Sequence, residues 1–188
     1  MSEVIRLRPV VESDLPLLER LYEDPVDASE FGFYGYSGTG RMRKRFDEGF
    51  INDNGGKLAI VRDGAPDEVG ESGDVYVGDV GWHRMVTGPK SFSWNIGIGL
   101  LARERGKGYG TRAQRLMVEY LFLHTQVNRI EAGTEIANIA EQRSLEKAGF
   151  TREGVLRGSC FRGGAWRDMV SYSILRADVD LGAPGRGV

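Results

Sequence analysis

Residues that bind metals or form disulfides are scarce in this chain of 188 residues. Cys160 is the one cysteine, which excludes an internal disulfide. The two histidines, His83 and His124, do not form the ligand spacing of a zinc site with it. We therefore expect neither a disulfide nor a structural metal.

An excess of charge of one sign is also missing. The 25 Lys and Arg residues nearly balance the 27 Asp and Glu residues, and the formal net charge is −2. The overall charge therefore gives no reason to expect nucleic acid or an anionic membrane as a partner. Apolar runs stay well below the ~20 residues that span a bilayer, and the first residues lack the layout of a signal peptide. We expect a cytoplasmic protein with no nucleic-acid or membrane partner.

The composition that is present is typical of a globular protein, with 40% hydrophobic and 28% charged residues. The length suits one domain with a sizeable core and is short for two. We place a single domain at residues 1–177. Residues 178–188 have little to bury, and we expect them to form a flexible C-terminal tail.

Strand-like and helix-like patterns alternate along the chain, which indicates an α/β (α+β) fold class. The predicted strands cover residues 4–8, 57–62, 75–86, 92–101, 128–135, 150–161 and 166–175. Helices are predicted to begin at Ser13 or Asp14, to cover 41–50, to follow a glycine-rich turn near 110, and to cover 138–148. A turn at 63–64 and an exposed loop at 64–74 separate two of the strands, and glycines at 88 and 163–164 predict hairpins.

The glycine-rich turn at residues 102–111 is the strongest local signal for a ligand. Gly106, Gly108 and Gly110 allow backbone conformations closed to other residues and let a ligand approach bare N–H groups. A helix that begins there adds unpaired N–H donors and the positive end of its dipole. Arg105 and Lys107 add charge. The turn predicts a phosphate or pyrophosphate site. The same sequence is also compatible with a glycine-rich turn that only links a strand to a helix.

Acidic and aromatic residues gather between residues 23 and 40, among four glycines, and we expect no regular helix there. The segment either forms a wall of a substrate site or packs its aromatic rings onto the core. Carboxylates attract a cation and ring faces receive it, so a wall would favour a cationic small molecule. The candidate substrate-binding residues are Asp27, Glu30, Phe31, Phe33 and Tyr34.

The form Arg-x-x-Gly-x-Gly at residues 105–110, between a strand and a helix, resembles the acyl-CoA pyrophosphate loop of the GNAT N-acetyltransferase superfamily. Further segments resemble its branch of ribosomal-protein-alanine N-acetyltransferases: residues 96–98, residues 138–150, and residues 154–158 with 167–169. The similarity covers roughly residues 3–176.

This resemblance implies a mixed, mostly antiparallel sheet with helices on both faces, which parts in a V between the strands ending at Leu101 and near Glu135. It also implies acetyl-CoA as co-substrate in that V. The pantetheine arm would contact the backbone of Gly99, Leu100 and Leu101 and the side chain of Asn138, with Arg143 one helical turn beyond. The pyrophosphate would lie on the turn, formed by Arg105, Gly106, Lys107, Gly108, Tyr109, Gly110 and Thr111.

The reaction that the resemblance implies is direct attack of a neutral primary amine on the thioester. The ammonium must first lose a proton, and the departing thiolate must be stabilised or gain one. Here the chain departs from the relatives it resembles. Leu145 occupies the position at which many members have a tyrosine acid, and Glu141 the position at which the closer branch often has serine.

The sequence leaves the proton-transferring group open. Glu141 is either a base or a solvated first-turn carboxylate favoured by the helix dipole. Asn138 is either a contact of the pantetheine arm or a helix cap, and both roles can hold together. Further candidates for the base are His83, Glu135 and Asp79, and for a proton donor Ser144 and Tyr109. We expect Cys160 to be a small buried filler.

The leading hypothesis is an acetyl-CoA-dependent N-acetyltransferase that acts on a protein N-terminus or on a small cationic amine such as an amino-sugar antibiotic. The alternative is a non-catalytic acyl-CoA-binding or sensing module, suggested by the absent tyrosine and serine. Nucleic-acid binding has little support, because the basic runs at 41–45 and 103–107 are typical of solvated faces. The sequence leaves a homodimer open.

Overall fold

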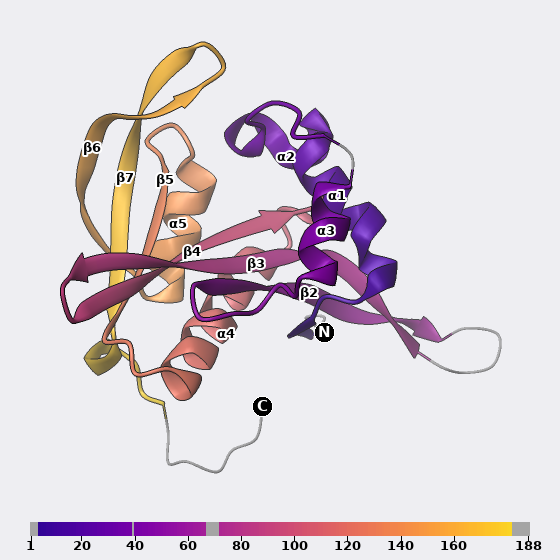
Figure 1. Cartoon of the computed structure of the whole chain (residues 1–188), viewed down its shortest axis with the longest axis horizontal. Coiled ribbons are helices and arrows are strands. Elements are labelled where there is room, and N and C mark those ends of the chain that lie inside the picture. Colours follow the sequence, from indigo (N-terminus) through magenta and orange to yellow (C-terminus); the bar gives the residue numbers. More distant parts are fainter. Residues whose placement is uncertain (1–3, 39, 67–71, 182–188) are drawn as a thin grey trace.

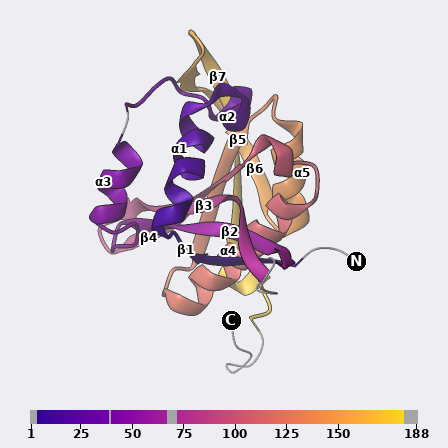
Figure 2. The same cartoon turned by 90° about the vertical axis from the view of Figure 1, so that its right-hand side faces the viewer.

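The computed structural model describes residues 4–38, 40–66 and 72–181. They form one seven-stranded sheet in the order β1-β2-β3-β4-β5-β7-β6, with helices on both faces (Figures 1 and 2). The strands are β1 (Ile5–Pro9), β2 (Gly55–Pro66), β3 (Ser72–Gly88), β4 (Ser91–Leu100), β5 (Arg129–Glu135), β6 (Thr151–Arg162) and β7 (Ala165–Leu175). The helices are α1 (Leu15–Glu23), α2 (Pro25–Gly32), α3 (Arg41–Asp47), α4 (Tyr109–His124) and α5 (Ile139–Ala148), with 3-10 turns at Glu12–Asp14, Ala102–Glu104 and Arg176–Asp178.

Strand β2 shows how one sheet carries two hydrophobic cores. Leu58 and Ile60 belong to the core beneath α4 and α5, while Ala59 and Val61 belong to the core beneath α1 and α3. Successive side chains of a strand point to opposite faces, so a continuous apolar run of this kind predicts helices on both sides. In the described part of the chain, no helix combines the length and apolar character that crossing a membrane requires.

The sheet parts between β4 and β5, as the resemblance implied. These strands are parallel and pair only at three positions, the last of which joins Ile96 to Ala132. Beyond it, β4 continues to Leu100 against β3 alone, and β5 continues to Glu135 against β7 alone. The two strands therefore diverge in a V whose inner edges carry backbone groups without a partner strand. The predicted mixed, mostly antiparallel sheet is confirmed.

The expectation of no regular helix between residues 23 and 40 is wrong for α2. The Asp24 side chain caps this helix by accepting hydrogen bonds from the N–H groups of Val26 and Asp27, and Pro25 occupies the first helical position. These local signals outweigh the nearby glycines. The helix is kinked at Ser29, whose φ of 64° lies in the left-handed region, and it ends at Gly32, followed by the extended Phe33.

The predicted turn at 63–64 is also wrong, because the β2–β3 ladder continues through it to Pro66 opposite Ser72. Asp63 lies opposite Asp74 in this ladder. Arg6 contacts both carboxylates, and Arg8 donates to Asp74 over 2.8 Å. These cations relieve the repulsion between the two aspartates and allow the strands to extend. Residues 67–71 of the predicted loop lie outside the described residues.

The chain after β7 stays on the body of the protein for several residues. Val179 and Leu181 pack against the main core, and the Arg176 guanidinium donates to the carbonyl groups of Phe122, Thr125 and Val127. Residues 178–181 of the expected tail therefore contact the body of the protein. Residues 182–188 lie outside the described residues.

Candidate active site

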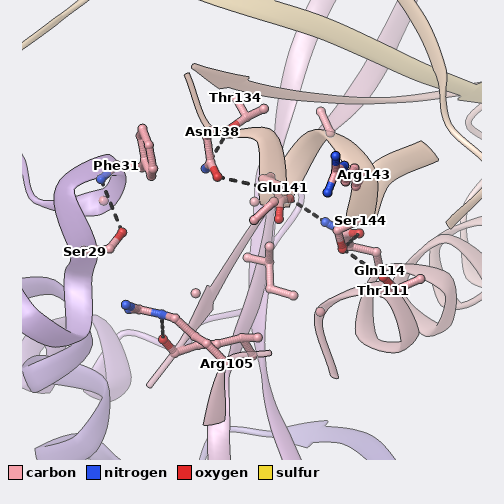
Figure 3. Close-up of a pocket in the computed structure, with 18 of the residues that line it drawn as sticks. Ser29, Phe31, Arg105, Thr111, Gln114, Thr134, Asn138, Glu141, Arg143 and Ser144 are labelled. Carbon is pink, nitrogen blue, oxygen red and sulfur yellow. Dashed lines mark hydrogen bonds between the residues drawn. The ribbon is translucent and has the colours of Figure 1, made fainter. Parts of the chain in front are cut away.

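The V between β4 and β5 opens into a cavity of about 720 Å³. One wall is the kinked end of α2, with Ser29 and Phe31, and the opposite wall is formed by α4 and the first turns of α5. Figure 3 shows Ser29 and Phe31 facing Asn138 and Glu141 across this space. The diverging strands form the wall between them, so the cavity joins the glycine-rich turn to the α2 segment.

The glycine-rich turn is open to the cavity. Gly106 and Gly108 have φ values of 75° and 79°, in the region that side chains disfavour, and nothing lies within 4 Å of the place where a Cβ would be. Both line the cavity together with Gly110 and Thr111. Helix α4 begins at Tyr109, and the first N–H groups of a helix lack intrahelical acceptors. This arrangement fits the diphosphate of a CoA-type ligand.

Arg105 and Lys107 of the turn have other partners. The Arg105 guanidinium donates to the carbonyl oxygens of Leu100 over 3.0 Å and Val26 over 3.2 Å, and also to that of Asp27. It lines the cavity but fastens α2 to the end of β4. The Lys107 Nζ donates to Glu104 over 2.9 Å. The predicted contribution of these charges to an anion site is therefore reduced by the partners they already have.

Two of the three backbone positions predicted to contact the pantetheine arm face the cavity at the end of β4, and the third does not. Gly99 and Leu100 line the cavity. Leu101 is buried, and its N–H donates to the carbonyl of Val77 over 3.0 Å, so this group is already used by β3. Tyr109 is buried behind the turn, in the main core, and does not line the cavity, which argues against its predicted role as a proton donor.

Asn138 links β5 to α5. Its Oδ1 accepts a hydrogen bond from the N–H of Glu141 over 3.3 Å, and its Nδ2 donates to the Thr134 hydroxyl over 3.0 Å. It therefore caps α5, and it also lines the cavity with Arg143. The cap holds the amide at the edge of the V, where it remains the predicted contact of a pantetheine arm.

Glu141 is not the solvated carboxylate that its first-turn position suggested. It is half-buried in the cavity wall, and its Oε1 accepts a 2.5 Å hydrogen bond from Nε2 of Gln114. Gln114 in turn accepts from the Ser144 hydroxyl over 2.9 Å, and the Ser144 and Thr111 hydroxyls lie 3.1 Å apart. Burial raises the pKa of Glu141 to about 7, and the hydrogen bond from Gln114 partly opposes that rise.

The other candidates for a base lie outside the cavity lining. His83 is exposed on β3, at a position paired with Gly55 and Asn95. Glu135 is buried and accepts a 2.9 Å hydrogen bond from Arg162. Asp79, which is also buried, contacts Lys57 and accepts from the Tyr22 hydroxyl over 2.9 Å. Each of these two carboxylates therefore already has a cation as its partner.

The acidic residues of the 23–40 segment do not face the cavity. Asp27 is buried, accepts a hydrogen bond from the N–H of Ala102 over 2.7 Å and pairs with Arg20 over 2.5 Å. Glu30 is exposed. The carboxylate of Asp27 therefore joins α2 to the start of the glycine-rich turn and is already neutralised, which argues against its predicted attraction of a cation.

The aromatic residues of the segment reach toward the β6–β7 hairpin. Phe31 lines the cavity, and the Arg162 guanidinium lies 5.5 Å from its ring centre. The Tyr34 hydroxyl lies 3.6 Å from the sulfur of Cys160, which is half-buried at this contact rather than a buried filler. Burial and this contact raise the pKa of Tyr34 to about 12. Phe33 packs edge-on against Tyr36.

Gln114 is a site residue that was not predicted from the sequence. It is 1% exposed on α4 and carries the hydrogen bond to Glu141. A signal exists, since Gln114 lies seven residues before Leu121 and so falls at the edge of the apolar stripe of the helix. Within the described ranges, no group of three or more Asp, Glu, His or Cys residues is placed to hold a metal ion.

Comparisons with known proteins agree with this geometry. A family model for the acetyltransferase (GNAT) domain matches residues 5–151. Over 107 residues the chain is 37% identical to the probable N-acetyltransferase YjcK of Bacillus subtilis (strain 168), a stretch that spans 57% of this chain and 59% of that relative.

Two solved structures share the fold. The spermidine N-acetyltransferase from Vibrio cholerae, in complex with CoA and spermine, has a TM-score of 0.76 at 17% identity over 93% of this chain and 96% of that chain. RimJ from Mycobacterium smegmatis, in complex with CoA-disulfide, has a TM-score of 0.71 at 21% identity over 95% and 85%.

Proposed function

Because the chain belongs to the GNAT acetyltransferase family, we propose that it transfers the acetyl group of acetyl-CoA to a primary amine. The observation that carries the proposal is the open glycine-rich turn at one end of a cavity that continues along the inner edges of the V. A long thioester with a diphosphate at one end matches that shape.

The proposed cofactor site uses residues from both sides of the V. Backbone N–H groups from Gly106 to Thr111 would hold the diphosphate, and the inner edge of β4 at Gly99 and Leu100 would hold the pantetheine arm together with Asn138. Arg143 lies on the same wall. When bound, acetyl-CoA supplies an activated acetyl group, so the chain needs to position two reactants and to manage one proton.

The amine would enter from the side of α2 and the β6–β7 hairpin, where the Phe31 ring faces the cavity. A protein N-terminus and a small cationic amine both remain candidate substrates. The structural neighbours include a spermidine N-acetyltransferase and RimJ. We keep the branch of ribosomal-protein-alanine N-acetyltransferases as part of the proposal.

The experiment measures release of the CoA thiol by purified protein with acetyl-CoA and three amines: spermidine, kanamycin, and a peptide with N-terminal alanine. We expect thiol release above the amine-free rate with at least one of them, and a mass increase of one acetyl group on that amine. Calorimetric binding of acetyl-CoA without turnover on any amine would support the alternative, a non-catalytic CoA-binding module. Absence of binding would contradict both.

A further inference from the structure

A half-buried carboxyl group on the wall of a reaction cavity needs an explanation, because an unpaired charge withdrawn from water is costly. Glu141 is such a group: it lines the cavity from α5, and it takes part in no ion pair among the residues that the structure describes. Its one side-chain partner is the neutral amide of Gln114, at 2.5 Å. A carboxyl group held this way is set up to hold and release a proton.

Neighbouring polar groups fix the carboxyl group in place. The N–H of Glu141 donates to Asn138, which holds the first turn of α5 against Thr134 of β5. On the other side, Gln114 is itself oriented by the Ser144 hydroxyl, which donates to its Oε1 over 2.9 Å. With Oε1 occupied, Nε2 of Gln114 is directed at Glu141. Helices α4 and α5 thus determine the position of this carboxyl group together.

Charged groups around the cavity leave Glu141 without a cation partner. Those on its walls are Arg105, Arg143 and Lys147. Arg105 donates to backbone carbonyls of β4 and α2, and Glu135 at the end of β5 is paired with Arg162. Arg112 of α4 lies over the Tyr109 ring, and Arg115 donates to the carbonyl of Lys147.

The position of Glu141 favours the leaving group over the amine. It projects from the wall that carries Asn138 and the start of α4, where the proposed site holds the cofactor. The α2 wall that would receive the amine lies across the cavity (Figure 3). A proton held by Glu141 is therefore on the side of the thioester sulfur.

The pKa of Glu141 suits a proton donor to the thioester sulfur. A glutamate with an ordinary pKa near ~4.3 would hold almost no proton at neutral pH, whereas burial raises the pKa of Glu141 to about 7. A free thiol has a pKa of ~8.5, so transfer from this carboxyl group to a thiolate is downhill. The same group would be a weak base toward an ammonium with a pKa of ~10.4.

We propose that Glu141 is the general acid that protonates the departing thiolate, and that Gln114 is its positioning residue; this rests on the proposed acetyltransferase function. As the amine nitrogen bonds to the carbonyl carbon, the carbon–sulfur bond breaks and its electron pair goes to sulfur. Sulfur takes the proton of Glu141, the amine nitrogen releases one proton to water, and the carboxylate regains a proton from solvent. One proton thus moves from nitrogen to sulfur overall.

The test compares wild type, Glu141→Gln and a matched control, Glu146→Gln. Glu146 lies on the same helix, is exposed and is absent from the cavity lining. We expect Glu141→Gln to lower kcat by about 100-fold, the usual scale for loss of a general acid, with little change in the Kd of acetyl-CoA measured by calorimetry. In the wild type, we expect kcat to fall as the pH rises above the pKa of Glu141, because the carboxyl group then has no proton to give. This fall should be absent in Glu141→Gln. Glu146→Gln should keep both kcat and the profile.

Two further measurements separate positioning from folding. Gln114→Met removes the hydrogen bond that favours the charged carboxylate, so the alkaline limb should move to higher pH. Carbon-13 NMR of labelled glutamate side chains should show one carboxyl group that titrates near neutral pH and is missing from Glu141→Gln. If Gln114→Met does not fold, the NMR titration and the kcat profile of Glu141→Gln still test the role of Glu141.

Different results would exclude the role of Glu141 and the acetyltransferase activity itself. Wild-type turnover with an unchanged kcat and pH profile in Glu141→Gln would overturn the role of Glu141 and leave the acetyltransferase intact. A wild type that neither binds acetyl-CoA nor releases thiol would overturn the proposed function, and the inference with it.

Discussion

The Glu141 carboxylate and the Gln114 amide form a 2.5 Å hydrogen bond that joins α5 to α4 in the wall of the cavity. Gln114 is almost completely buried, and Glu141 has no cation beside it among the residues described. Burial therefore raises the pKa of Glu141 to about 7. A raised pKa on an acid means that the folded protein binds its proton more tightly than the unfolded chain does.

This linkage predicts how stability depends on pH. The unfolded carboxyl group loses its proton at about pH 4 and the folded one at about pH 7, so the contribution of Glu141 to stability declines between these values. Glu141→Gln should raise the free energy of unfolding by up to about 3 kcal/mol at about pH 8 and change it little at about pH 4. Urea unfolding at the two pH values measures this, and an equal difference at both would contradict it.

Arg105 should matter more for the fold than its place in the glycine-rich turn suggests. Arg105→Met would leave the carbonyls of Leu100, Val26 and Asp27 without this donor and loosen α2. We expect a loss of about 2 kcal/mol in the free energy of unfolding and faster amide exchange in α2. The control is Arg103→Met, because Arg103 is exposed. Equal losses of unfolding free energy in the two variants would contradict the role of Arg105 in holding α2 against β4.

Asp27 offers a test between two readings of the 23–40 segment. Asp27→Asn should lower thermal stability, because it weakens the pair with Arg20 and the hydrogen bond from Ala102. The KM for a cationic amine should stay within about twofold, since this carboxylate does not line the cavity. Glu30→Gln, an exposed position, serves as control. A large rise in KM for spermidine without a loss of stability would restore the sequence-based hypothesis.

The glycine-rich turn has a matched control elsewhere in the chain. Gly108 and Gly49 have φ values of 79° and 84°, and both have open space where a Cβ would be. Replacement by alanine therefore imposes a similar strain of about 1 kcal/mol at each. Only Gly108→Ala should weaken acetyl-CoA binding, by about tenfold or more, because only that Cβ would enter the proposed diphosphate site. Calorimetry on both variants decides, and equal affinities would contradict the site.

Local sequence signals were sufficient for much of the fold. The apolar run of β2, the apolar stripe of α4 and the glycines at 163–164 each predict their element from residues that are close together in the sequence. Asp24 and Pro25 carried an equally clear signal for the start of α2, which the glycines around Tyr34 obscured. The turn expected at 63–64 failed because cations from β1 stabilise the longer ladder, a contact between distant segments.

The site was harder to predict for the same reason. The positive φ of Gly108 follows from its neighbours in sequence, but the environment of Glu141 depends on the packing of α5 against α4. Likewise, two of the three carbonyl partners of Arg105 belong to a helix nearly eighty residues earlier in the chain. Only the folded structure shows that the Arg105 guanidinium donates hydrogen bonds to backbone carbonyl groups.

The most direct measurement is the perturbation of backbone amide NMR signals by acetyl-CoA. The account predicts saturable shifts that are largest for Gly106, Gly108, Gly110 and Thr111, with smaller ones at Gly99 and Asn138. Shifts centred on another surface, or no shifts at saturating acetyl-CoA, would contradict the claim that this turn binds the diphosphate of the acetyl donor.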